Sequence, residues 1–235
     1  MPVTSYIFWL GLAEISFYIS GFIVHAAAGR ILGPADYGVY GLIVTLTILI
    51  ASLIGNGIPI AMSKFLSSAL ATDPNKIRSI KRQSAVAQFV LMGAVTALFF
   101  FGAPAIAWAL RDPSLVRLLR ISAFIIPCFA AETYYFYYYT GIHQFNMQSI
   151  LKFLRSLFRV IVIVGLGYFF LLKGFVAGYI FVPLVVFIIA FIVDKAVYAA
   201  RFTKKPESGF ATKKLLSYAL PITGFLVLYE AMISL

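Results

Sequence analysis

Six apolar stretches, each long enough to cross a lipid bilayer, occupy most of this chain and restrict it to a polytopic membrane fold. They cover residues 6–28, 38–62, 84–110, 118–141, 157–172 and 175–199, and a seventh begins near Tyr218. We therefore expect an all-α bundle of transmembrane helices with six complete spans and a seventh that has started. Residues 1–200 would form an N-terminal lobe and residues 201–217 a cytoplasmic basic linker. Residues 218–235 would open a second lobe whose remainder is missing.

Basic residues predict the orientation of the bundle. Most of the 19 Lys and Arg follow every second span, at Lys64, Lys76, Arg78, Lys81, Arg82, Lys152, Arg155, Arg159, Lys195, Arg201, Lys204, Lys205, Lys213 and Lys214. The opposite connections hold only Arg30, Arg111, Arg117, Arg120 and Lys173. Because cytoplasmic loops of membrane proteins carry the excess of Lys and Arg, we expect a multi-pass protein of the cytoplasmic membrane with a cytoplasmic N-terminus.

Composition supports the membrane class and excludes other functions. Hydrophobic residues make up 62% of the chain and charged residues 11%, whereas about a quarter of a soluble domain is charged. Basic loops beside anionic lipid account for the net charge of +11, so we expect membrane lipid rather than nucleic acid as a partner. The single cysteine, Cys128, and two isolated histidines offer no metal cluster, and no phosphate loop or nucleophile elbow is present. We expect no cofactor and no enzymatic activity.

Two carboxylates lie at membrane depth, where a charge costs at least about 2.5 to 3.5 kcal/mol and usually faces a cavity or a partner. Glu14 falls in the first span and Glu132 in the fourth. Glu14 shares a narrow helical face with Gly11, Gly21 and His25, which we expect to line the bundle interior. Two interpretations stay open: these groups hydrogen-bond to neighbouring helices, or the carboxylates bind a coupling proton or Na⁺.

Lys152, Arg155 and Arg159 follow i, i+3, i+7 spacing at the cytoplasmic end of the fifth span and therefore form one basic stripe. Such a stripe is suited to grip a diphosphate. The alternative is that the long side chains extend to the inner headgroups of the membrane. Lys64, at the inner end of the second span, has the same two interpretations.

Tyrosines crowd the inner end of the fourth span, at Tyr134, Tyr135, Tyr137, Tyr138 and Tyr139. Amphipathic rings favour the membrane interface, which predicts an aromatic belt at this level. A role in stacking against sugars is the weaker hypothesis.

The turn after the first span carries the most specific motif. Arg30, Gly33, Pro34, Tyr37 and Gly38 fit the pattern R-x-L-G-P-x-x-Y-G. This pattern resembles the first external turn of polysaccharide transporters, the O-antigen-type flippases of the multidrug/oligosaccharidyl-lipid/polysaccharide exporter superfamily. Later segments, 176–179 and 213–221, resemble the starts of the sixth and seventh helices of that family.

The resemblance implies two similar helical lobes around a cationic cavity that moves a polyprenyl-diphosphate-linked oligosaccharide outward by alternating access. Arg30 and the turn glycines would shape the outer gate. By analogy, Lys64, Lys152, Arg155 and Arg159 would bind the diphosphate, and Glu14 and Glu132 would bind the coupling ion.

The chain departs from that pattern in length, because its 235 residues hold one lobe and part of the next helix. A second lobe or another copy of the chain would have to complete a transporter. Two alternatives stay open: a cation-coupled drug or metabolite exporter of the same superfamily, and a non-transporting membrane scaffold from a truncated gene. A membrane glycosyltransferase is disfavoured, since no acidic pair lies in a sizeable polar loop.

Overall fold

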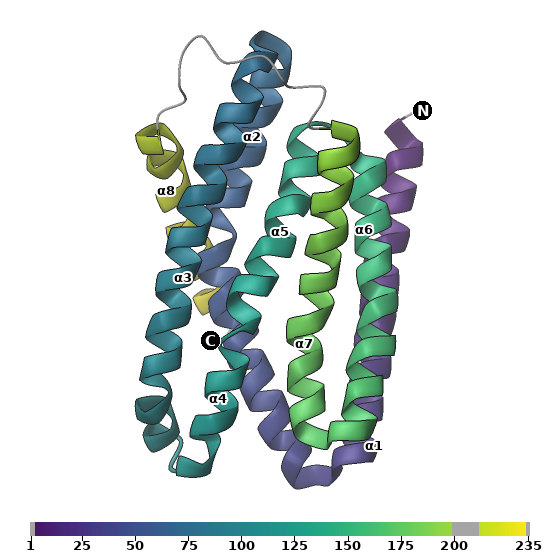
Figure 1. Ribbon diagram of the computed structural model, residues 1–235, viewed down its shortest axis with the longest axis vertical. Helices are drawn as coiled ribbons and strands as arrows, with labels where there is room; N and C mark the ends of the chain where they lie inside the picture. The colour runs from purple at the N-terminus through teal and green to yellow at the C-terminus, as the bar shows by residue number, and fades with distance from the viewer. Residues whose placement is uncertain (1–2, 199–211, 234–235) are drawn as a thin grey trace.

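The computed structural model describes residues 3–198 and 212–233, and every regular element in these ranges is helical (Figure 1). The α-helices are α1 (Val3–Gly55), α2 (Gly57–Thr72), α3 (Ile77–Ala109), α4 (Val116–Ser122), α5 (Ile125–Gly141), α6 (Phe145–Phe158), α7 (Gly165–Val193) and α8 (Thr212–Ile233). Short 3₁₀ turns, Pro74–Lys76 and Pro113–Leu115, precede α3 and α4. Two π-helical segments, η3 (Arg159–Val164) and η4 (Asp194–Tyr198), precede and follow α7. The expected all-α bundle is confirmed.

Two long helical segments reverse direction at a single residue. Helix α1 runs the length of the bundle and returns (Figure 1), and Gly33 at the reversal has φ 73° and ψ 175°. This conformation is open almost only to glycine, and Pro34 then starts the returning arm with a fixed φ. The second reversal is inside α7, at Leu171, with φ 51°. The turns expected between spans one and two and between spans five and six are therefore present.

The second predicted span differs in detail from the observed helices. Asn56 interrupts the helix between α1 and α2, and α2 continues to Thr72, beyond the predicted end at Met62. Pro59 has no backbone N–H to donate, and the Gln88 side chain donates instead to the Gly55 carbonyl at 2.9 Å. The extension past Met62 includes the polar residues Ser63, Lys64 and Ser67, so the helix continues beyond the apolar stretch that predicted the span.

The described N-terminal residues and the turns after α2 and α5 lie at one end of the bundle (Figure 1). This is the arrangement that alternating spans require, and the cytoplasmic assignment of that end stays a prediction. Most of the predicted linker, residues 201–211, lies outside the described residues. Its remainder, residues 212–217, belongs to α8. The division into lobe, linker and second lobe stays a prediction.

The core has two main clusters, one in each half of the bundle. Tyr40 and Phe175 are fully buried in the half that contains the Gly33 turn, and Leu66 and Tyr139 are fully buried in the other half. Large apolar side chains also cover the outside, and Phe89 is 80% exposed. Four continuous helical segments, 8–72, 74–109, 113–141 and 145–198, are long and apolar enough to cross a membrane. The chain is a multi-pass membrane protein, and the number of crossings stays a prediction.

The tyrosine cluster does not form an aromatic belt. Tyr134, Tyr135, Tyr138 and Tyr139 are all buried. The Tyr134 hydroxyl donates to the Lys81 carbonyl at 2.6 Å, and the Tyr139 hydroxyl donates to the Ala190 carbonyl at 2.9 Å. Helix α5 packs against α2, α3 and α7 (Figure 1), so its end is enclosed by protein rather than by headgroups. These rings tie α5 to α3 and α7.

Candidate functional site

The basic stripe predicted on the fifth span faces the inside of the bundle. It runs from α6 into η3, which pack against α1, α5 and α7. Lys152 forms an ion pair with Glu14 on α1, and the Arg155 Nε atom lies 3.4 Å from the Glu132 Oε2 atom on α5. The two carboxylates that the sequence placed at membrane depth are thus partners of the stripe, and three helices meet at this set of charges.

Glu132 is the most enclosed charged group of the set. Its side chain is 0% exposed, and neither carboxylate oxygen has a hydrogen-bond partner within the described residues. Arg155 is 20% exposed, and its guanidinium lies 4.8 Å from the centroid of the Phe17 ring and 5.4 Å from that of Phe129. Aromatic faces attract a guanidinium, so they help to hold Arg155 inside the bundle. The ionised Glu132 carboxylate is therefore stabilised mainly by one arginine, Arg155.

Arg159 occupies the next turn, at the start of the π-helical segment η3. Its guanidinium donates to the Phe17 carbonyl and to the Tyr179 hydroxyl, both at 3.4 Å. A Cβ at Gly21 would lie 3.1 Å from Arg159 Nη1, so the glycine leaves room for this approach. Tyr179 in turn hydrogen-bonds with Tyr40 at 3.0 Å. Single π-helical turns inside longer helices often occur at functional sites, and this one begins at a charged group.

A cavity of about 250 Å³ opens beside the stripe. Its lining residues are Ala13, Glu14, Phe17, Asn56, Thr133, Phe136, Tyr137, Gln148, Lys152 and Arg155. The polar groups Asn56, Thr133 and Gln148 were not predicted, whereas Tyr137 belongs to the predicted tyrosine cluster. Gln148 precedes Lys152 by one helical turn, so extending the helical face of the stripe backward would have found it. The two cations and Glu14 therefore share one polar space.

Other predicted residues lie elsewhere. Lys64 is exposed on α2, and its Nζ atom lies 3.7 Å from the centroid of the Tyr218 ring on α8. It does not line the cavity beside the stripe. His25 lies across the reversal from the turn motif, where its Nδ1 atom is 3.2 Å from the Tyr37 hydroxyl.

The turn motif forms the tight reversal of α1. Gly33 supplies the left-handed backbone, Pro34 starts the returning arm, and Tyr37 joins the two arms through His25. Arg30 is exposed at this end of the bundle. A Cβ at Gly38 would meet nothing within 4 Å, so close packing does not explain that glycine. The described contacts give the motif a structural role, and its role as an outer gate stays a prediction.

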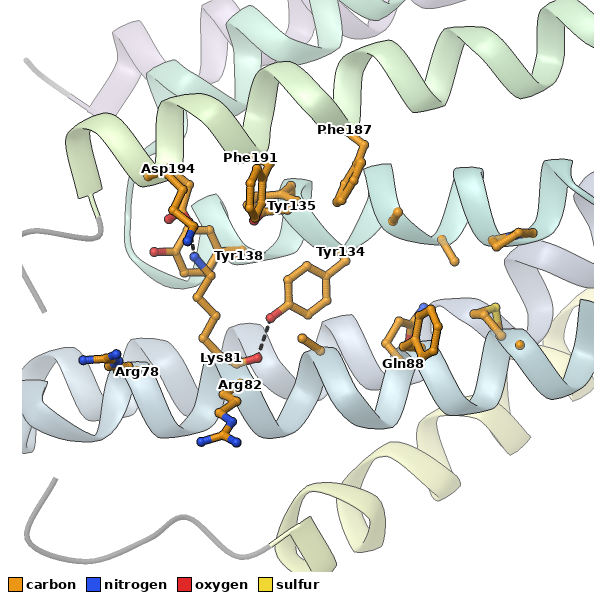
Figure 2. Close-up of a pocket in the computed structure, with 18 of the residues that line it drawn as sticks. Arg78, Lys81, Arg82, Gln88, Tyr134, Tyr135, Tyr138, Phe187, Phe191 and Asp194 are labelled. Atoms are coloured by element: carbon orange, nitrogen blue, oxygen red, sulfur yellow. Dashed lines mark hydrogen bonds and ion pairs between the residues drawn. The ribbon is translucent and has the colours of Figure 1, made fainter. Parts of the chain in front are cut away.

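A second, larger pocket of about 770 Å³ lies between α3, α5 and α7. Figure 2 shows Lys81 extending from α3 to Asp194, the first residue of η4, with which it forms an ion pair. The Lys81 ammonium also lies 4.2 Å from the centroid of the Tyr138 ring. Residues farther along the pocket are mostly apolar, among them Phe89 and Phe187, and the lining also includes the polar side chain of Gln88. Among residues 3–198 and 212–233, no group of His, Cys, Asp and Glu is suited to hold a metal.

Comparisons with known proteins agree with the fold. The sequence profile of the polysaccharide biosynthesis protein family matches residues 3–230. The comparison with curated proteins gave no match.

Two solved structures have a similar fold. A crystal structure of MATE in the straight conformation aligns with a TM-score of 0.64 and 21% identity, over 80% of this chain and 44% of that chain. The outward-facing conformation of a multidrug resistance MATE family transporter of the MOP superfamily aligns with a TM-score of 0.65 and 22% identity, over 82% and 45%. The present chain thus spans less than half the length of either structure. The chain belongs to the polysaccharide biosynthesis protein family and forms the N-terminal lobe of the MATE fold.

Proposed function

We propose that this chain takes part in moving a polyprenyl-diphosphate-linked oligosaccharide across the cytoplasmic membrane by alternating access. The observation that carries the proposal is the stripe of Lys152, Arg155 and Arg159, which lies inside the bundle and is opposed by two carboxylates. Cations at membrane depth are expensive and mark substrate or ion pathways in transporters. The family match supports a polysaccharide-type substrate.

The charge balance suggests how binding and coupling are linked. Three cations face Glu14 and Glu132, so the cluster carries one net positive charge when both carboxylates are ionised. We propose that a diphosphate and the two carboxylates compete for the same cations. A proton or Na⁺ on either carboxylate then frees Lys152 or Arg155 for the diphosphate. Guanidinium groups suit this exchange because their planar fork matches carboxylate and phosphate oxygens equally well.

The size of the cavity limits what it can hold. Ligand pockets for small molecules usually measure about 300 to 1,000 Å³, whereas the cavity beside the stripe measures about 250 Å³. A diphosphate fits this volume, and the attached sugars must lie outside it. We propose that a second lobe, or another copy of this chain, encloses the sugars opposite the stripe.

A binding assay tests the proposal. The full chain in detergent is titrated with a fluorescent polyprenyl-diphosphate disaccharide, with neutral polyprenol as the reference ligand. Loss of one charge-assisted contact costs about 1.5 to 3 kcal/mol. Lys152→Gln and Arg155→Gln, which change the two cations that line the cavity, should therefore each weaken diphosphate binding by about ten- to a hundredfold.

The carboxylate variants test the proposal more sharply, because they should strengthen diphosphate binding, whereas loss of a cation should weaken it. Glu14→Gln should tighten diphosphate binding roughly two- to fivefold, since Glu14 no longer competes for Lys152. Glu132→Gln should tighten it further, because Glu132 is buried. Arg117→Gln, an exposed change at the opposite end of the bundle, is the matched control. If the carboxylate variants weaken binding, or if polyprenol binds as tightly as the diphosphate, the proposed exchange is wrong.

The second candidate is export of a cationic drug or metabolite, which the multidrug MATE structure of similar fold favours. In that case Glu14 and Glu132 would bind the substrate directly. Their present pairing with Lys152 and Arg155 opposes this use. Uptake of a cationic dye that survives loss of the three cations and fails with Glu132→Gln would support the exporter instead.

A further inference from the structure

The larger pocket between α3, α5 and α7 has a charged end and an apolar end. Figure 2 shows Arg78 at the same end as the ion pair of Lys81 with Asp194. Lys195, which also lines the pocket, follows Asp194 directly in the sequence and so lies at this end too. Arg78 forms no ion pair with any described residue, and Asp194 is the one acidic residue among those that line the pocket. Positive charge is therefore in excess at this end. A ligand with an anionic group at one end would complement this positive charge.

The rest of the pocket is suited to a hydrocarbon chain. Apart from Gln88, whose amide nitrogen donates to the Gly55 carbonyl, the lining along α3 from Ala85 to Gly93 is apolar, and it lies opposite Pro127 on α5 and Phe187 on α7. Phe89 is 80% exposed on the outer surface of the bundle, so the pocket opens sideways to the lipid that surrounds the protein. A membrane lipid can therefore enter directly from the bilayer.

The length of the pocket corresponds to one leaflet. Arg78 and Gly93 both line it, and their separation on α3 corresponds to about 22 Å along the helix axis. A bilayer with its headgroup regions is about 40 to 45 Å thick, so one leaflet measures about 20 to 22 Å. A lipid with its headgroup at Arg78 would have its acyl chain end near Gly93. The charged end lies on the side of the bundle that holds the described N-terminal residues (Figure 1).

We propose that this pocket is a binding site for one anionic glycerophospholipid of that leaflet. The headgroup phosphate lies against Arg78 and Lys195, and one acyl chain follows the apolar groove past Phe89 to Gly93. Basic pockets between transmembrane helices on the cytoplasmic side are a known setting for anionic headgroups. The site differs from the cavity at the basic stripe, because the two pockets share no lining residue. The proposal does not depend on the transported substrate.

The pocket also links the lipid to the position of α7. Asp194 begins η4, and its one ion pair within the described residues joins it to Lys81 on α3. A phosphate beside Lys195 would add a second electrostatic connection between the same two helices. The bound lipid would thus hold α3 and α7 together at this end of the bundle.

Native mass spectrometry of the full chain tests the site. Protein in detergent is titrated with phosphatidylglycerol or with phosphatidylcholine of the same acyl chains. We expect one phosphatidylglycerol to bind more tightly than phosphatidylcholine. Taking about fivefold for each basic residue, Arg78→Gln/Lys195→Gln should weaken phosphatidylglycerol binding about 25-fold. The control Arg117→Gln/Lys173→Gln removes the same two charge types from exposed positions at the opposite end and should change nothing.

A second pair of variants tests the groove. A Cβ at Gly93 or at Gly102 would meet nothing within 4 Å, and of the two glycines only Gly93 lines the pocket. Gly93→Phe should therefore block the acyl chain and reduce lipid binding at least tenfold, while Gly102→Phe should leave it unchanged. Because a Cβ is accommodated at both positions, both variants are compared with the wild type in SDS unfolding, and a folded Gly93→Phe protein that has lost lipid binding supports the groove.

Four results would overturn the proposal. Equal binding of the two lipids would show that the groove does not select an anionic headgroup. Displacement of the lipid by inorganic phosphate at millimolar concentration would indicate a site for free phosphate. A dimer that disappears with Gly93→Phe would show that a second copy occupies the groove. Lipid binding that survives both the charge variant and Gly93→Phe would place the lipid elsewhere.

Discussion

The buried pair of Arg155 and Glu132 makes a quantitative prediction about stability. The Nε and Oε2 atoms are 3.4 Å apart, and the Glu132 side chain is 0% exposed. At an effective dielectric constant of about 20, two unit charges at that distance attract each other by about 5 kcal/mol. Arg155 is 20% exposed, so water screens part of this attraction. We expect a coupling free energy of about 3 kcal/mol between the two side chains.

A double-mutant cycle measures this coupling. Arg155→Met keeps the apolar stem but leaves a buried carboxylate without its cation, which should cost about 3 to 5 kcal/mol of unfolding free energy. Glu132→Gln keeps the shape of the side chain. The double variant should recover most of the loss, because it no longer contains an unpaired charge. Unfolding in mixed micelles with rising SDS can be followed by alkylation of Cys128, the single cysteine of the chain.

A surface pair of nearly the same length is the control. Lys76 and Asp73 lie 3.3 Å apart, but their side chains are 41% and 38% exposed. The cycle of Lys76→Met with Asp73→Asn should give a coupling of at most about 0.5 kcal/mol. If the buried and surface pairs give the same coupling, burial does not strengthen the interaction. The inference that these charges face a dehydrated interior would then be refuted.

Two glycines in restricted positions, each compared with a glycine in an open position, give the remaining stability predictions. Gly33→Ala should lower the free energy of unfolding by about 1 to 3 kcal/mol, because its backbone conformation is nearly exclusive to glycine. Gly29→Ala, at an open helical position, should be neutral or slightly stabilising. Gly174→Ala should be more harmful, because its Cβ would lie 1.9 Å from the Leu166 carbonyl oxygen, whereas Gly165→Ala meets nothing within 4 Å. SDS unfolding of all four variants tests both pairs, and equal stability within a pair contradicts the packing argument.

Hydropathy and charge predicted the depth of each segment but not the direction in which its side chains point. The spacing of Lys152, Arg155 and Arg159 predicted one basic face, and the structure confirms that they share a face. It could not predict the ion pair of Lys152 with Glu14, because the two residues are 138 positions apart. Helix rotation and packing decide such contacts.

The tyrosines at the end of α5 show the same limit. Their position near a membrane boundary stays a prediction, but α5 is surrounded by other helices, and Tyr134, Tyr135, Tyr138 and Tyr139 are buried rather than facing headgroups. The reversal at Leu171 was also hard to place, since leucine has no preference for a positive φ. Gly33, followed by proline, was a clear signal of a turn, because the backbone conformations that glycine and proline favour do not depend on distant contacts. Local signals are readable from sequence, whereas contacts between distant helices are not.

Flipping of a fluorescent polyprenyl-diphosphate oligosaccharide in liposomes that hold this chain tests the central claim most directly. Our proposal that a second lobe or another copy of this chain completes the cavity predicts that the wild-type protein, which can meet further copies in the liposome, moves the lipid between leaflets. Lys152→Gln/Arg155→Gln/Arg159→Gln should abolish the movement, and Arg117→Gln/Lys173→Gln should preserve it. Movement at the wild-type rate without the three cations would show that the stripe is not in the substrate path. Absence of movement in folded, inserted wild-type protein would contradict transport by this chain and support a membrane scaffold.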